Sequence, residues 1–299
     1  MNKKPRLKKA PKEHYGMICN IEFKSPGIKI IHGIFLIVSL FLSAICLLPL
    51  LWVILSSFKS TAEFMAIPPS FLPEKIDLAK FVEVWQMESF TKLYINTIIL
   101  AAGEIFFTIT VNGLAGYVIS RLKPRGSQLV FMVVTWTMLL PTTGNMVPLF
   151  QTFINFFGIN LSNSFWPMWL MSAANCYYVL LFKSYFDSLS ISFFESAKID
   201  GCTNLQMFVK IVLPLSIPVI CVIMIFQFNG AWGTFLWPFL LNTNGKWTII
   251  GQRMYVLQKQ TTIDRYVMAM TITTIPPTIM YLIFQKQIIG GLTVGGVKG

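Results

Sequence analysis

The chain has 299 residues, of which 55% are apolar and only 12% carry a charge. Soluble domains carry about 25% charged residues, so this composition excludes a soluble enzyme, a disordered chain and a secreted disulfide scaffold. The formal net charge of +12 is interpreted as lysine and arginine gathered on the cytoplasmic side of a lipid bilayer, and no nucleic-acid partner is expected. The composition predicts a polytopic membrane protein.

Uncharged stretches locate the expected membrane spans, because a spanning helix needs about 20 apolar residues and an ionisable group at its centre is costly. Counting such stretches predicts six spans with approximate bounds 31–57, 93–120, 128–149, 164–186, 212–233 and 266–285. Turn-forming residues between the third and fourth spans predict a hairpin at 150–163. The expected fold class is an all-α polytopic membrane protein with six transmembrane helices.

Basic residues are distributed unevenly among the loops. The first 29 residues hold eight lysines and arginines against two glutamates, whereas segment 58–92 holds four basic residues against five acidic ones. The short loop after the second expected span contains Arg121, Lys123 and Arg125 and no acid. The positive-inside rule therefore predicts that both termini lie in the cytoplasm.

Catalytic and energy-converting motifs are absent from the sequence. It contains no G-x-x-x-x-G-K-[ST] phosphate loop, no nucleophile–base pair and no carboxylate cluster with metal-ligand spacing. The five scattered cysteines are interpreted as packing residues. The longest loops, 58–92 and 234–265, have about 30 residues each, short of a typical domain. We therefore expect a non-enzymatic chain that binds no metal or cofactor itself and depends on partners for energy and for solute capture.

The segment between the fourth and fifth expected spans predicts a compact helical element. Ser192 and Glu195 have the spacing of a capping box, which starts a helix at about Phe193. Gly201 ends this helix, since glycine tolerates the left-handed conformation that closes a helix. A second short helix from about Asn204 then runs into the membrane. The expected product is a docking element that protrudes into the cytoplasm.

This segment resembles the EAA loop of permease subunits from binding-protein-dependent ABC importers, whose pattern is E-A-A-x-x-D-G-A-x-x-x-x-x-F-x-x-I-x-L-P. The residues that match are Glu195, Ala197, Asp200, Gly201, Phe208, Ile211, Leu213 and Pro214. Ser196 and Cys202 replace two alanines of the pattern with similarly small residues. The resemblance places the coupling loop at 190–212.

The resemblance extends over most of the chain and is to the second, maltose G-type, permease subunit of carbohydrate importers. Similar segments are 49–52, 57–59, 96–97, 115–117 with Arg121, 230–232, 235–238 and the tail 291–299. Trp232 is followed by Gly233 and Thr234, where the family often has Trp-Asn-Asp-Phe. Residues 1–28 lie outside the resemblance and form a basic cytoplasmic segment, and 29–299 form the expected transmembrane permease domain. The glycine-rich tail is not expected to form a stable helix.

The resemblance implies the transmembrane domain of a type I ABC importer in the bacterial plasma membrane. The implied partners are a second, homologous permease in a heterodimer, two ATPase subunits that bind ATP and Mg²⁺, and an extracytoplasmic sugar-binding protein. The implied solute is a sugar, with an oligosaccharide expected. The coupling role is implied for Glu195, Ala197, Asp200, Gly201, Phe208 and Pro214. Glu195 would meet a basic ATPase residue, Ala197 would allow close approach, and Gly201 would permit the sharp turn.

Polar residues inside the expected spans are candidates for the solute path, and they are Glu104, Asn112, Gln227, Asn229 and Trp232. A carboxylate at mid-span costs about 2.5–3.5 kcal/mol on insertion scales, so Glu104 should face the bundle or a cavity. Two alternatives stay open for this set. The polar groups could instead hydrogen-bond between helices, and Trp232 could be an anchor at the membrane interface rather than a platform for a sugar ring.

A secondary transporter or channel for a small polar solute is the alternative function. Proteins of that class more often show two similar halves or several paired charges within the membrane. This sequence shows no internal repeat and one intramembrane carboxylate. Co-purification with an ATPase would separate the two classes, since only the importer needs that partner.

Overall fold

The computed structural model describes residues 26–140 and 142–294. Within that range the secondary structure is helical, and a single β-bridge joins Phe156 to Ile159 inside the predicted hairpin. The chain separates into two compact units, Met1–Leu55 and Ser56–Gly299. Most of the basic segment 1–28 lies outside the described residues, so its cytoplasmic placement stays a prediction.

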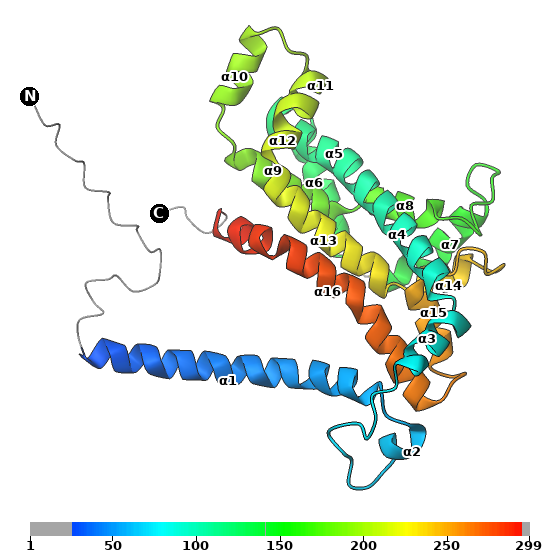
Figure 1. Cartoon of the computed structure of the whole chain (residues 1–299). Helices are drawn as coiled ribbons and strands as arrows, with labels where there is room; N and C mark the ends of the chain where they lie inside the picture. Colours follow the sequence, from blue (N-terminus) through cyan, green and yellow to red (C-terminus); the bar gives the residue numbers. More distant parts are fainter. Residues whose placement is uncertain (1–25, 141, 295–299) are drawn as a thin grey trace, which may run out of the picture. The chain divides into compact units, whose positions relative to one another are not determined.

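The first unit contains the long helix α1, Pro26–Ser56 (Figure 1). Its 31 residues extend about 46 Å at the usual rise of a helix, which is enough to cross a bilayer. Gly27–Ser56 is apolar enough to cross a membrane. The first expected span is confirmed as a long apolar helix that begins earlier than residue 31.

Two further helices of the described range are long and apolar enough to cross a membrane. One runs from Phe90 to Leu122 and the other from Ile263 to Gln285. The first consists of α4 (Phe90–Phe107), η2 (Thr108–Asn112), α5 (Gly113–Tyr117) and η3 (Val118–Leu122), in which η2 and η3 are wider, π-helical turns. The second belongs to α16 (Ile263–Val294), which stays helical through Pro276 and Pro277. The expectation of a non-helical tail is therefore wrong for 291–294, and 295–299 lie outside the described residues.

The third, fourth and fifth expected spans are interrupted. Their pieces are α6 (Ser127–Thr137), η4 (Thr142–Asn145) and α7 (Met146–Ile154); α8 (Trp166–Ala173) and α9 (Cys176–Ser188); and α12 (Leu213–Leu215) and α13 (Ile217–Gly233). The segment Asn204–Leu215 meets α13 at a 78° bend. Pro218 has no backbone N–H to continue the ladder there. The described residues therefore hold three single helices long enough to span, or four with the bent pair, and the count of six stays a prediction.

Short helices occupy the connections. They are α2 (Thr61–Phe64), α3 (Leu78–Met87), α10 (Ser192–Ile199), α11 (Asn204–Met207), η5 (Phe208–Val212), α14 (Leu236–Leu241) and α15 (Ile250–Leu257). In Figure 1, α10 and α11 lie at one end of the second unit and α3 and α15 lie at the other. Within the second unit these connecting helices therefore lie at two opposite ends.

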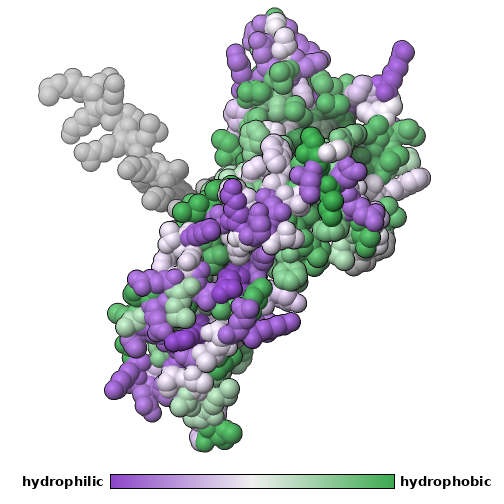
Figure 2. Space-filling model, turned by 90° about the vertical axis from the view of Figure 1, so that its right-hand side faces the viewer, coloured by the Kyte–Doolittle hydropathy of each residue, from purple (hydrophilic) through white to green (hydrophobic). Residues whose placement is uncertain are grey.

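Buried side chains form two clusters in the second unit. One lies among α4, α8, α13 and α16 and includes Phe90, Leu100, Trp232 and Met268. The other, which we call the Tyr117 cluster, lies at the α10 end and consists of Tyr117, Tyr178, Phe182, Phe186, Phe194, Phe208, Val212, Val219 and Ile223. Many large apolar side chains are nevertheless exposed. Figure 2 shows hydrophobic side chains over much of the surface, with hydrophilic side chains at the top, where α10 lies in Figure 1, and over much of the lower half. Such a surface fits lipid contact.

Candidate functional site

The start of α10 differs from the prediction. The helix begins at Ser192, and its N-cap residue is Ile191, which has no capping side chain. The hydroxyl of Ser192 lies 2.8 Å from the hydroxyl of Ser190. The predicted capping box with Glu195 is therefore wrong, because Ser192 already lies inside the first turn, where its side chain is not placed to accept the third amide.

The end of α10 follows the prediction. Gly201 adopts a φ of +74°, its amide donates to Lys198 at 3.1 Å, and the amide of Cys202 donates to Ala197 at 2.9 Å. This pair of bonds is a Schellman motif, which satisfies carbonyls left free at a helix end. A Cβ at Gly201 would meet no atom within 4 Å, so the backbone conformation rather than lack of space requires glycine.

The second helix of the hairpin carries a capping box that the sequence analysis missed. The Thr203 hydroxyl accepts from the Gln206 amide at 3.3 Å, and the Gln206 side chain accepts from the Thr203 amide at 2.9 Å. The T-x-x-Q spacing was the available signal. From there α11 and η5 lead to Pro214, which stands at the start of α12 as predicted. We call the whole segment, 190–215, the coupling hairpin.

Residues of the EAA pattern divide between two faces of the coupling hairpin. Ala197 is 4% exposed, and Phe208 belongs to the Tyr117 cluster. Glu195, Asp200 and Gly201 are exposed, as is Pro214. Ala197 thus faces the chain itself, whereas the implied ATPase contact requires an outward side chain. The outward face of α10 instead combines Glu195 with Ile199, which is 86% exposed.

Arg121 lies at the base of the coupling hairpin. Its guanidinium donates hydrogen bonds to the carbonyls of Phe186 and of Leu189, the latter at 2.6 Å. It also lies 4.5 Å from the ring centroid of Phe194 on α10. Arg121 was expected only as a loop charge and as part of the family resemblance, because no local pattern in the sequence reveals these distant contacts.

Asp187 follows the last residue of the fourth expected span and lies beside Arg121. Its carboxylate accepts from the Ser120 hydroxyl at 2.6 Å and from the Lys183 ammonium at 2.7 Å. Burial alone would raise the pKa of Asp187, but these hydrogen bonds and the charges of Lys183 and Arg121 hold the pKa below its ordinary value. The carboxylate is therefore ionised at neutral pH.

Asn112 and Gln227 are used in hydrogen bonds between helices. The Asn112 amide group donates to the Ser172 carbonyl at 2.8 Å and accepts from the Asn175 backbone at 3.2 Å. Gln227 on α13 donates to the Thr108 hydroxyl. The two Asn112 bonds satisfy backbone groups freed where α8 and α9 separate. Both side chains therefore make hydrogen bonds between helices.

Trp232 is also engaged inside the bundle. Its side chain is 7% exposed, and its indole donates to the Thr273 carbonyl at 2.9 Å. Its ring stacks on Phe228 with 5.0 Å between ring centroids. The Trp232 side chain is thus held by contacts within the bundle.

Glu104 and Asn229 are placed differently from the other candidates. Glu104 is 8% exposed, and it faces the bundle as expected for a carboxylate in a span. Asn229 has an exposed side chain on α13, where its amide donates to the Ile225 carbonyl of its own helix at 3.0 Å. Gly230 and Gly233 are exposed on the same helix. An amide and two glycines thus interrupt an otherwise apolar helix surface.

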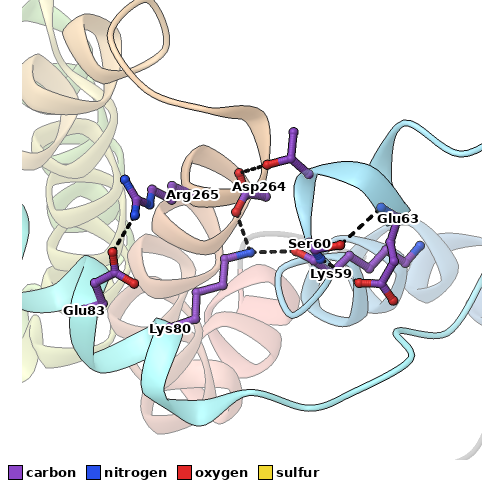
Figure 3. A network of polar contacts seen from close by, with 8 residues as sticks. Lys59, Ser60, Glu63, Lys80, Glu83, Asp264 and Arg265 are labelled. Atoms are coloured by element: carbon purple, nitrogen blue, oxygen red, sulfur yellow. Dashed lines mark hydrogen bonds and ion pairs between the residues drawn. The ribbon is translucent and has the colours of Figure 1, made fainter.

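Charged side chains fasten the loop 58–92 to α16 (Figure 3). Lys80 on α3 contacts the carboxylate of Asp264 at 3.1 Å and donates to the Lys59 carbonyl at 2.7 Å. Glu63 accepts from the backbone amides of Ser60 and Glu74, which lowers its pKa. A second pair joins Arg265 to Glu83. Sequence analysis did not find this network, because its members are separated by most of the chain.

Metal ligands are not grouped in the described part of the chain. No set of three or more His, Cys, Asp or Glu side chains there could hold an ion. The second unit thus presents the coupling hairpin, a helix surface with polar interruptions on α13, and a loop at 58–92 that ion pairs hold against α16.

Comparisons with known proteins give a consistent result. A family model described as "Binding-protein-dependent transport system inner membrane component" matches residues 112–293. The diacetylchitobiose uptake system permease protein NgcG of Streptomyces coelicolor is 30% identical over 257 residues, covering 85% of this chain and 84% of that protein. The arabinooligosaccharides transport system permease protein AraQ of Halalkalibacterium halodurans is 29% identical over 264 residues, covering 87% and 94%.

The fold is shared with a solved structure. That structure is a bacterial ABC transporter involved in the import of the acidic polysaccharide alginate. The TM-score is 0.72 at 22% identity, over 88% of this chain and 98% of the solved chain.

Proposed function

Because this chain belongs to the family of inner membrane components of binding-protein-dependent transport systems, we propose that it forms half of the translocation pathway of an ATP-driven oligosaccharide importer. The relatives named for diacetylchitobiose and for arabinooligosaccharides support the solute class. The proposed assembly contains a second, homologous permease, two ATPase subunits and an extracytoplasmic sugar-binding protein. ATP and Mg²⁺ belong to the ATPases, and this chain binds no cofactor.

The coupling hairpin is the observation that carries the proposal. It ends α10 in a Schellman turn at Gly201 and presents Glu195 and Ile199 outward. An exposed apolar side chain beside a carboxylate fits a partner cleft with an apolar floor and a basic rim. A secondary transporter or channel, the alternative function, has no use for such an element.

The placement in the membrane follows from the charge distribution. We assign both termini and the coupling hairpin to the cytoplasm, and the loop 58–92 to the outside of a bacterial plasma membrane. The ordered polar network of that loop then faces the sugar-binding protein. The chain crosses the bilayer several times, with six spans proposed.

Asn229 and Glu104 are the proposed pathway residues. An exposed amide on a membrane helix is unfavourable against lipid, so the α13 face with Asn229, Gly230 and Gly233 is proposed to line the pathway or to meet the second permease. Glu104 is proposed to sense the passing solute from within the bundle. Asn112, Gln227 and Trp232 contribute by holding the helices in place.

The experiment compares two identical charge reversals on opposite sides of the membrane. Glu195→Lys should abolish co-purification of the ATPases and sugar uptake, because it places a cation against the proposed basic rim. Glu74→Lys, in the exposed outer loop, should leave ATPase association unchanged. Equal ATPase binding by the wild-type protein and Glu195→Lys would contradict the proposal.

A further inference from the structure

The helix that runs from Phe90 to Leu122 ends in the π-helical turn η3, which contains Arg121. π-Helical turns are rare and occur often at functional sites. Arg121 bonds the carbonyls of Phe186 and Leu189 at the exit of α9. Carbonyls at a helix end lack partners within the helix and favour a nearby cation. One side chain therefore holds the end of a neighbouring helix and the first residue after it.

The same guanidinium also reaches α10. It lies 4.5 Å from the ring centroid of Phe194, a geometry typical of a cation–π interaction. Tyr117, one turn before Arg121, stacks on that ring with 6.5 Å between centroids and contacts Phe208 at 5.4 Å. Two successive turns of the Phe90–Leu122 helix thus contact α10 and the first residue of η5, which lie on either side of the turn at Gly201.

Neighbouring contacts also hold the Phe90–Leu122 helix against α9. Ser120 donates to Asp187, which also pairs with Lys183. At Gly116 the helices α5 and α9 come so close that a Cβ would lie 2.8 Å from the Cβ of Phe182. These short polar contacts and the tight packing leave little room for sliding between the two helices.

From these contacts we infer that Arg121 is a positioning residue that makes the coupling hairpin and the Phe90–Leu122 helix move as one body. This inference rests on the proposed function and deepens it. Displacement of α10 by an ATPase reaches Glu104 through Arg121 and Phe194, in addition to the covalent link from α12 to α13. Lysine cannot replace Arg121 fully, because a point charge does not offer the planar set of donors that meets two carbonyls and a ring together.

The test uses the complete complex in proteoliposomes, with its partner permease, ATPases and binding protein. Uptake and ATP hydrolysis are measured together. Uptake by the wild-type complex tests the proposed function. If the wild-type complex shows no uptake, the proposed function fails, and the inference about Arg121 is a separate question decided by the variants. Arg121→Gln should assemble and hydrolyse ATP, while sugar transported per ATP falls about tenfold, within the usual range of coupling between sites. Arg121→Lys should recover only part of this ratio.

The matched control is Arg125→Gln, which changes an exposed arginine of the same loop and should leave the ratio at the wild-type value. An unchanged ratio in Arg121→Gln, or a parallel loss of assembly, hydrolysis and uptake in both Arg121→Gln and Phe194→Leu, would overturn the inference.

Phe194→Leu supplies an independent variant, since it keeps an apolar side chain in the Tyr117 cluster but removes the aromatic ring. It should uncouple as Arg121→Gln does, and Phe194→Trp, which keeps a π face, should preserve the ratio. Because both residues form the contact between the Arg121 guanidinium and the Phe194 ring, the loss in the double variant Arg121→Gln/Phe194→Leu should be smaller than the sum of the two single losses. Additive losses would contradict the inference.

Discussion

The amide of Cys202 donates to the carbonyl of Ala197 across 2.9 Å and thereby closes α10. The six residues from Ala197 to Cys202 turn back within this one bond, which is possible because Gly201 has a φ of +74°. The acidic residues of the EAA pattern are exposed around this closure. The geometry of the turn and the charge of the hairpin can therefore be tested separately.

Gly201→Asp and Gly201→Asn separate these two effects. Both side chains tolerate the left-handed conformation better than most, but only aspartate adds a negative charge at the end of α10, which costs about 0.3–1 kcal/mol and places the charge at the proposed ATPase contact. We expect Gly201→Asp to abolish uptake and to weaken ATPase co-purification, and Gly201→Asn to keep a measurable part of both. Normal uptake by Gly201→Asp would show that the turn has no coupling role.

Glu104→Gln tests the buried carboxylate. If Glu104 acts on the solute path, the loss of one charge-assisted hydrogen bond of about 1.5–3 kcal/mol should lower uptake by about tenfold or more. The amount of protein in the membrane should stay constant. Thr110→Val on the same helix is the control, because the Thr110 hydroxyl bonds only to backbone of its own helix. Unchanged uptake and unchanged stimulation of ATP hydrolysis in Glu104→Gln would assign it a structural role.

Asp264→Asn tests the attachment of the outer loop. The side chains of Lys80 and Asp264 are only 11% and 13% exposed, so removing the charge should cost about 1.5–3 kcal/mol of local stability. Amide hydrogen exchange in 60–87 should accelerate accordingly. Arg265→Gln breaks a pair with 41% and 48% exposed side chains, for which we expect at most about 1 kcal/mol. Equal effects of both variants would argue against the Lys80 network as the main attachment.

Single cysteines in a cysteine-free background test the orientation. We expect Asn244→Cys, in the exposed loop before α15, to react with an impermeant maleimide in intact cells. Asn204→Cys, exposed on the coupling hairpin, should react only after permeabilisation. The reverse pattern would invert the proposed topology.

Sequence reasoning predicted the helices that stay uncharged and uninterrupted. The gaps between charges located α1, the Phe90–Leu122 helix and α16. They did not reveal the separation of α8 from α9, because the whole stretch from Arg125 to Lys183 is uncharged. The break is instead marked by Asn175, whose side chain caps α9.

The candidate site was predicted where its chemistry is local. The end of α10 depends on Gly201 and its immediate neighbours, so spacing was sufficient. The contact between Arg121 and Phe194 joins residues far apart in the sequence and follows only from packing. The same reason explains why the burial of Trp232 was not predicted, because this burial depends on packing against α16 and not on the sequence around Trp232.

ATP-driven sugar uptake by the reconstituted complex tests the central claim most directly. Proteoliposomes would contain this chain, its partner permease and the ATPases. The binding protein and a radiolabelled oligosaccharide are added outside the vesicles, and ATP is enclosed inside them, on the side of the coupling hairpin. We predict uptake that requires ATP and the binding protein and that disappears with Glu195→Lys. Uptake by this chain alone, driven by an ion or solute gradient and insensitive to Glu195→Lys, would contradict the account.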